Sequence, residues 1–92
     1  SEKFTEYGKK VITLLQNSDI RALIDERSEK AGRKIRDAEI RKIPYMLIVG
    51  EKEEEGGTVS VRRHGQGDMG ALPVEEFINL VKNEVEESLK HL

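Results

Sequence analysis

The centre of this chain is a run of five apolar residues, Y-M-L-I-V at positions 45–49, which ends at Gly50. A strand with one face in water alternates apolar and polar side chains, and this run does not alternate. Unbroken apolar strands are typical of sheets that are covered on both faces, as in α/β proteins. The run therefore predicts a buried strand in an α/β fold, with helices on both sides of the sheet.

Three amphipathic segments predict those helices. The first covers residues 1–17, with Ser1 as its expected N-cap. The second runs from about 29 to 42 and ends before Pro44, because the residue ahead of a proline avoids helical geometry. The third starts at Pro73, a residue that suits the first turn of a helix. The apolar stripes that are expected to face the sheet are Phe4, Tyr7, Gly8, Val11, Ile12 and Leu15, then Ala31, Ile35 and Ala38, then Val74, Phe77, Ile78, Val81, Val85 and Leu89.

Two further segments predict strands, and two predict polar connections. Residues 20–24 are short and β-branched at both ends, which favours a strand after the first helix. Residues 58–62 alternate cleanly, so we expect a strand with one wet face, antiparallel to the strand at 45–49. An acidic turn is expected at 51–57 and a glycine-rich loop at 64–72. The predicted order is helix, strand, helix, strand, strand, helix.

This order begins with a helix, although a parallel βαβ unit needs a strand first. We therefore expect residues 1–92 to form one domain, an N-terminally truncated part of a larger protein. The lost strand would leave an open sheet edge beside residues 20–24 or 45–49. Because exposed sheet edges recruit strands from other chains, we expect the fragment to form dimers or to exchange strands.

Composition excludes several classes of protein. The chain has no cysteine, so it can form neither a disulfide framework nor a thiolate zinc site. No apolar run is long enough to span a membrane, no secretory signal pattern opens the sequence, and no membrane partner is expected. The formal net charge of −2 lacks the basic balance that usually marks nucleic-acid binding. Positive charge is only local, since residues 21–45 carry eight Lys and Arg against five Asp and Glu.

Three motif-like patterns have ordinary explanations. Residues 65–70 match G-x-G-x-x-G, but a dinucleotide site needs a helix that starts inside the motif, and the expected helix starts after it. His64 has no evident nucleophile or positioned carboxylate, so we expect a surface histidine. The acidic run at 51–55 lacks the spacing and the central glycine of a calcium loop. No catalytic centre is therefore expected in these residues.

A row of basic residues is the strongest candidate for a binding surface. It would line the loop before the second helix and the exposed side of that helix, through Arg27, Lys30, Arg33, Lys34 and Arg41. A solvated face with partner carboxylates is the commoner origin of such a pattern. Ligands of open α/β sheets, however, collect at the carboxyl ends of parallel strands, which here means residues 25–30 and 50–53. Arg62 could approach the same region, from a side of the sheet that the sequence leaves open.

Two longer strings resemble a known family. D-x-R-x-E-K-x-G-x-K-I-R from Asp25 and I-P-Y-M-L-I-V-G from Ile43 resemble the C-terminal anticodon-binding domain of bacterial threonyl-tRNA synthetase, a class II aminoacyl-tRNA synthetase. The resemblance extends from about Ile12 to Leu89. It implies a fold with a mixed five-stranded sheet and three helices that starts with a strand. For this chain we thus expect an α/β domain, a small mixed sheet flanked by three helices and lacking its first strand.

The resemblance also implies the residues that bind tRNA. Glu53 and Arg62 match the family positions that read the middle and last anticodon bases of threonine tRNA. A carboxylate can accept the N1–H and N2–H₂ donors of an unstacked guanine, and arginine can donate to base oxygens or phosphate. Ser28 stands where the family often has asparagine. With Arg27 of the basic row, the predicted tRNA-binding residues are Glu53, Arg62, Ser28, Lys30, Arg27 and Lys42.

Further expectations concern a parent enzyme. The resemblance implies a cytoplasmic, homodimeric threonine–tRNA ligase that attaches threonine to its tRNA and uses ATP, magnesium and a catalytic zinc. The catalytic domain would be a partner of this domain within the parent, and no cofactor or metal is expected in residues 1–92. Two alternatives stay open. One is the equivalent domain of another class II synthetase, chiefly prolyl, and the other is a stand-alone interaction module that reuses the fold.

Overall fold

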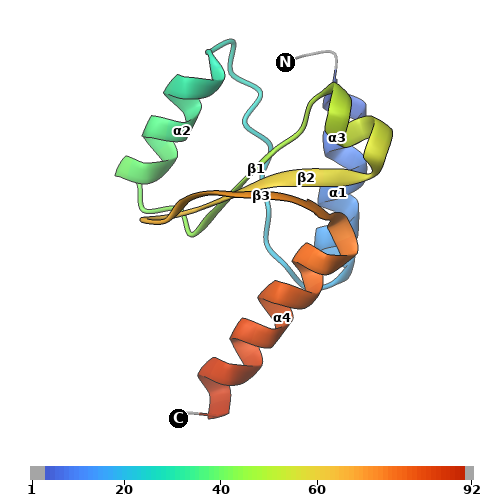
Figure 1. Ribbon diagram of the computed structural model, residues 1–92, viewed down its shortest axis with the longest axis vertical. Helices are drawn as coiled ribbons and strands as arrows, with labels where there is room; N and C mark the ends of the chain where they lie inside the picture. Colours follow the sequence, from blue (N-terminus) through green and yellow to red (C-terminus); the bar gives the residue numbers. More distant parts are fainter. Residues whose placement is uncertain (1–3, 91–92) are drawn as a thin grey trace.

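The computed structural model describes residues 4–90 and is shown in Figure 1. Its elements, in chain order, are α1 (Thr5–Asn17), α2 (Ala31–Ile40), β1 (Tyr45–Ile48), α3 (Glu51–Gly56), β2 (Thr58–Arg63), β3 (Gly67–Pro73) and α4 (Val74–Lys90). The predicted α/β class, with helices around a small sheet, is confirmed. The cap predicted at Ser1 lies outside the described residues.

The sheet has the order β1-β2-β3, and both pairs of strands are antiparallel. The antiparallel pairing predicted between the segments at 45–49 and 58–62 is therefore confirmed, with Leu47 opposite Val61. In the second pair, Val61 lies opposite Gly70 whereas Arg62 lies opposite Asp68, so Met69 is one residue extra. This irregularity is a β-bulge, which bends the strand that carries it.

The pleat gives the sheet two unlike faces. Successive side chains of a strand point to opposite sides, so Val59 and Val61 share one face of β2, which we call the core face. Both residues are completely buried. The opposite side, which we call the open face, is formed by Met46, Ile48, Ser60 and Arg62. The two faces meet different partners.

Helices α1 and α4 cover the core face, and α2 covers part of the open face. Side chains of α1 and α4 join Val59 and Val61 in one buried cluster through Val11, Leu15, Val74, Phe77 and Ile78. On the other side, Ile35 and Ala38 of α2 line a small cavity together with Met46 and Arg62. Figure 1 shows α2 and α4 on opposite sides of the sheet. The sheet is thus the middle layer of three.

An aromatic and ionic cluster ties β1 and β2 to α4. The ring of Tyr45 meets the ring of Phe77 edge to face, with centroids 5.3 Å apart. The Tyr45 hydroxyl donates to Glu84 Oε1 over 2.6 Å, and Arg63 Nη1 lies 3.0 Å from the same oxygen. The guanidinium of Arg63 also lies over the Tyr45 ring, 5.4 Å from its centre. Beyond this cluster, α4 runs past the sheet, so Val85 and Leu89 of the predicted stripe are exposed instead of buried.

Both α1 and α2 end in the same backbone motif. After α1, the N–H groups of Asp19 and Ile20 donate to the carbonyls of Gln16 and Leu15. After α2, the N–H groups of Lys42 and Ile43 donate to the carbonyls of Glu39 and Ala38. This pattern is the Schellman motif, whose left-handed residue is usually glycine. Here a non-glycine residue holds that position in each case, Asp19 with φ 62° and Lys42 with φ 59°.

The strand predicted at residues 20–24 is wrong, because this segment is an irregular connection. Its side chains still alternate as in a strand, with Ile20 and Ala22 packed against the core and Leu23 94% exposed. No strand in residues 4–90 pairs with its backbone. Without a neighbouring strand to form hydrogen bonds, a strand-like side-chain pattern does not become a strand. The sheet formed by the described residues is therefore antiparallel throughout, without the parallel neighbour expected there.

The turn predicted at 51–57 and the loop predicted at 64–72 are also wrong. Residues 51–56 form α3, with acidic residues in its first turn and Gly57, at φ 67°, as its C-cap. Acidic side chains near a helix N-terminus and a left-handed glycine at its C-terminus favour a helix even this short. From Gly67 onward, the predicted loop is strand β3, paired with β2. Backbone hydrogen bonds form this strand, and its mostly exposed side chains give no apolar pattern.

Candidate nucleic-acid interface

The six predicted tRNA-binding residues lie in four places. Arg27, Ser28 and Lys30 belong to the loop of residues 25–30, which leads into α2, and Lys42 follows the other end of α2. Arg62 lies on the open face of the sheet, and Glu53 lies in α3. The structure thus groups three of them in one loop and places the other three separately, after α2, on the open face and in α3.

Arg27 is paired with two carboxylates. Its Nε and Nη2 donate to the two oxygens of Asp25, over 2.9 and 2.7 Å, and its Nη1 donates to Asp37 of α2 over 2.9 Å. The hydrogen bonds from the Arg27 side chain are the main reason that the pKa of Asp25 falls from its ordinary 3.8 to about 2. The two carboxylates in turn raise the pKa of Arg27. Arg27 is therefore neutralised within the protein.

Lys34 also differs from its predicted place on an exposed basic face. Its Nζ donates to the backbone carbonyl of Asp25 over 2.9 Å, so it connects α2 to the 25–30 loop. The remaining cations of α2 and its flanks do not form such contacts with carboxylates of the described residues. Within residues 4–90, no carboxylate forms an ion pair with Lys30, Arg33, Arg36, Arg41 or Lys42. These five exposed residues carry charge that is available to a ligand.

Sequence reasoning missed Arg36 among these five. Arg36 follows Arg33 by three positions, so the two side chains lie on the same side of α2. Both are exposed. The local excess of Lys and Arg in residues 21–45 was the signal that could have added Arg36 to the predicted basic row.

Arg62 lies on the part of the open face that α2 covers. It is opposite Met46 of β1 and Asp68 of β3, and it is half-buried beneath α2. Its Nε is buried and has no hydrogen-bond partner among the described residues. The adjoining cavity has a volume of only about 10 Å³. A buried donor without a partner is rare and costs free energy, and a cavity of this size has room for at most one water molecule.

Glu53 lies in α3, which follows the end of β1. It is the third residue of α3, and its side chain turns back so that Oε1 would lie 3.1 Å from a Cβ placed on Gly50. Burial raises the pKa of Tyr7 in α1, and the negative charges of Glu53 and Glu54 raise it further. Both carboxylates therefore lie near α1. No hydrogen bond or ion pair joins Glu53 to Arg62 in the described chain.

The separation of Glu53 from Arg62 follows from the strands. Gly50 comes just after β1, whereas Arg62 is opposite Met46 near the start of β1. Four residues of strand span roughly 13 Å. The two residues are therefore well separated along the sheet.

Lys42 owes its place to the end of α2. It holds the left-handed position of the Schellman motif, and its side chain is exposed. Lys30 holds the opposite end of the helix, as its N-cap residue with an extended backbone. The ten residues of α2 separate these two ammonium groups, with exposed arginines between them. Such a row of cations can follow a phosphate backbone.

Two kinds of structure are absent from residues 4–90. No helix in that range combines the length and the apolar character that a membrane crossing requires. Nor do three or more His, Asp and Glu side chains of that range gather into a group that could hold a metal ion.

Comparison with known proteins identifies the class of this domain. The anticodon binding domain family matches residues 1–84, which is most of the chain. The chain therefore belongs to the anticodon binding domain family. This result agrees with the cation row and with the resemblance drawn from the sequence.

The similar proteins are threonine–tRNA ligases. The chain is 58% identical over 92 residues to the threonine–tRNA ligase of Flavobacterium johnsoniae, covering 98% of this chain and 14% of that protein. It is 59% identical over 86 residues to the threonine–tRNA ligase of Bacteroides fragilis, covering 94% and 13%. The identity to the enzyme of Porphyromonas gingivalis is 49% over 89 residues, covering 97% and 14%. The predicted resemblance is confirmed, and the chain spans about one seventh of the length of these relatives.

Proposed function

We propose that this chain binds the anticodon loop of threonine tRNA as the C-terminal domain of a threonine–tRNA ligase. The observation that carries the proposal is the row of five cations along α2 and its flanks that form no ion pair within residues 4–90, beside an open sheet face that holds Arg62. The similarity to threonine–tRNA ligases supports threonine tRNA as the partner. In the parent enzyme, other parts of the chain would bind ATP, magnesium, zinc and threonine, and the parent would be a cytoplasmic homodimer.

The charges of the molecule favour one orientation of the RNA. Residues 30–42 carry six Lys and Arg against two Asp and Glu, whereas α4 carries five Glu against two Lys. RNA carries one negative charge per nucleotide, so it is attracted to the α2 side and repelled by α4. This segregation explains how a chain with a net charge of −2 can bind nucleic acid.

The candidate residues divide into two kinds of contact. Lys30 and Lys42 are exposed point charges, which suit phosphates and add affinity without regard to sequence. Arg62 on the open face and Glu53 in α3 carry planar groups, which suit the edges of unstacked bases. Ser28 adds a hydroxyl from the exposed 25–30 loop. We therefore assign discrimination to Arg62 and Glu53, and general attraction to the lysines.

The first experiment compares two RNAs. The chain is titrated with the anticodon stem-loop of threonine tRNA and with the same stem-loop carrying a replaced anticodon, over a range of salt concentrations. Glu53→Ala should reduce the difference in binding free energy between the two RNAs by about 1–3 kcal/mol. Lys30→Ala should weaken both complexes equally and lower the salt slope by about 1. Equal weakening of both RNAs by Glu53→Ala would refute its role as a base-reading residue.

A second experiment tests the parent function. The matching segment of the Flavobacterium johnsoniae threonine–tRNA ligase is replaced by this chain, and aminoacylation of threonine tRNA is measured. We expect the chimera to charge threonine tRNA and to lose rate when the anticodon is changed. Tighter binding of the isolated chain to a proline tRNA stem-loop would favour the prolyl alternative. Absence of any RNA binding at low salt would favour an interaction module.

A further inference from the structure

The 25–30 loop has no apolar anchor. All six of its side chains are exposed, and none belongs to the buried cluster of the domain. Loops without buried contacts open easily and sample many conformations. Yet this loop carries Ser28 and Lys30, two of the proposed RNA contacts. Something other than apolar packing must therefore hold it in place.

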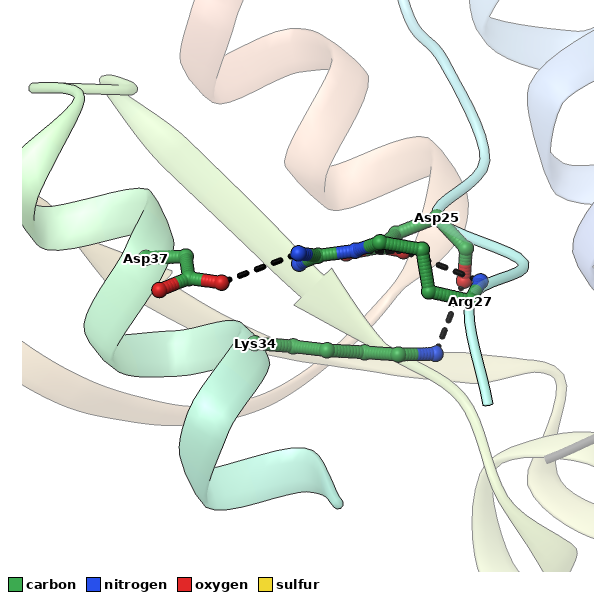
Figure 2. A network of polar contacts seen from close by, with 4 residues as sticks. All are labelled: Asp25, Arg27, Lys34 and Asp37. Carbon is green, nitrogen blue, oxygen red and sulfur yellow. Dashed lines mark hydrogen bonds and ion pairs between the residues drawn. The ribbon is translucent and has the colours of Figure 1, made fainter. Parts of the chain in front are cut away.

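Two side chains hold the loop, and they run in opposite directions (Figure 2). Arg27 reaches from the loop to Asp37 on α2, and Lys34 reaches from α2 back to the carbonyl of Asp25. Within the loop, Asp25 Oδ1 also accepts the backbone N–H of Arg27 over 3.1 Å. The loop is thus connected to α2 at two points, through the carbonyl of Asp25 and through the side chain of Arg27.

Asp25, Arg27, Lys34 and Asp37 together carry no net charge that could attract a ligand. Two carboxylates and two cations sum to zero, and three N–H groups of the Arg27 side chain donate to Asp25 and Asp37. A guanidinium that is paired in this way attracts a phosphate less than the unpaired cations nearby. Its planar fork is what allows Arg27 to bridge two carboxylates at once, which the single ammonium of a lysine does not reproduce.

We propose that Arg27 is a positioning residue and not an RNA contact. Together with Asp25, Lys34 and Asp37, it fixes the 25–30 loop on α2 in the conformation that presents Ser28 and Lys30. This inference rests on the proposed function, and it corrects the role that the sequence suggests for Arg27. It also assigns a role in RNA binding to Asp37, a carboxylate that would be expected to repel RNA.

The test uses the fact that charge and positioning predict opposite changes in RNA affinity when Asp37 is replaced. By charge alone, removing a carboxylate beside the interface should tighten RNA binding. If Asp37 positions the loop, Asp37→Asn should instead weaken binding of the threonine anticodon stem-loop by about two- to fivefold. Glu26→Gln is the matched control, because Glu26 lies in the same loop and its carboxylate forms no ion pair with residues 4–90. The control should leave binding unchanged or tighten it. Equal or tighter binding by Asp37→Asn would overturn the proposal.

A second measurement needs no RNA. Amide hydrogen exchange of Arg27, Ser28 and Glu29 is followed in the free wild-type chain and in Arg27→Lys, which preserves the charge. Faster exchange in Arg27→Lys supports the positioning role, and unchanged exchange contradicts it. Failure of the wild-type chain to bind RNA would refute the proposed function, while this exchange measurement would still decide whether Arg27 holds the loop.

Discussion

The two faces of the sheet are stabilised by different interactions. On the core face, seven apolar residues of α1, α4 and β2 form one buried cluster. On the open face, α2 contributes Ala38 as its only buried residue, and the loop before it is held by ion pairs and hydrogen bonds. One half of the domain is built by apolar burial, and the other half is built largely by polar contacts.

This difference separates stability from recognition. Apolar burial is the larger source of folding free energy, so the core face can stabilise the whole domain. The open face and the 25–30 loop can then keep exposed polar groups, and also the buried Nε of Arg62, which has no hydrogen-bond partner in residues 4–90. Substitutions on the two sides should consequently affect different measurements, and the following predictions test that division from the largest effect to the smallest.

The largest loss of stability is expected from Phe77→Ala. Phe77 is 3% exposed and contacts the ring of Tyr45, so truncation removes a large buried side chain and leaves a cavity. Such changes cost about 3–5 kcal/mol. Ile43→Ala, next to α2 and 41% exposed, should cost under about 1.5 kcal/mol. Urea unfolding measures both variants, and equal losses would contradict the division into two halves.

A smaller loss is expected from Tyr45→Phe, which removes the hydroxyl that donates to Glu84. The lost hydrogen bond should cost about 0.5–1.5 kcal/mol near neutral pH. Burial, followed by the bond to Glu84, raises the pKa of Tyr45 to about 12. A raised pKa means that this contribution is full below pH 10 and disappears as the pH rises through about 12. Wild type and variant should thus converge in strongly alkaline solution, and a constant difference would exclude the titration.

A gain in stability is expected from Lys42→Gly. Lys42 holds a left-handed backbone conformation, which glycine adopts without steric cost, so the variant should gain about 1 kcal/mol. Asp19→Gly at the end of α1 is the matched control and should gain a similar amount. Only Lys42→Gly should weaken RNA binding, because it removes an ammonium group beside the open face. Equal RNA affinity of the two variants would remove Lys42 from the interface.

The smallest effect on stability is expected from the titration of Asp25 at low pH. The pKa of Asp25 is lowered to about 2 by its bonds from Arg27, so its contribution to stability is present above the ordinary carboxyl range. That contribution is lost as the pH falls through about 2. Arg27→Lys should move the pKa of Asp25 back toward 3.8, as measured by carbon-detected NMR titration. An Asp25 pKa that stays near 2 in the variant would show that the fork of Arg27 is not the cause.

The core-face half could be predicted from the sequence because its signals are local. The helical spacing of Val11 and Leu15, and the alternation of Val59 and Val61, each report one buried face within a few residues. These patterns identified α1, α4 and β2, and the structure confirms all three elements. The unbroken apolar run at 45–49 identified β1, but the burial predicted on both of its faces is wrong, because its residues are only half-buried. Residues 20–24 show the limit of such signals, because a strand also needs a neighbour for its backbone.

The other half was harder to predict because its interactions are polar, distant or made by the backbone. Strand β3 is held by backbone pairing with β2, and its glycines and exposed side chains resemble a loop in sequence. The bond from Arg27 to Asp37 joins residues ten positions apart, and residue spacing alone does not choose between Asp37 and a phosphate as the partner. Arg27 came from the basic row, the other candidate RNA-binding residues came from the family resemblance, and the roles of all six are predictions.

The most direct test compares two neighbouring arginines on opposite faces. Arg63 lies on the core side, where it pairs with Glu84 and covers Tyr45, whereas Arg62 lies on the open face without an ion pair in residues 4–90. Each is replaced by alanine, and both urea stability and the preference for the threonine anticodon are measured. We predict that Arg62→Ala loses about 1–3 kcal/mol of anticodon preference with nearly normal stability, and that Arg63→Ala loses stability and keeps the preference. A loss of preference in Arg63→Ala, with none in Arg62→Ala, would contradict the assignment of recognition to the open face.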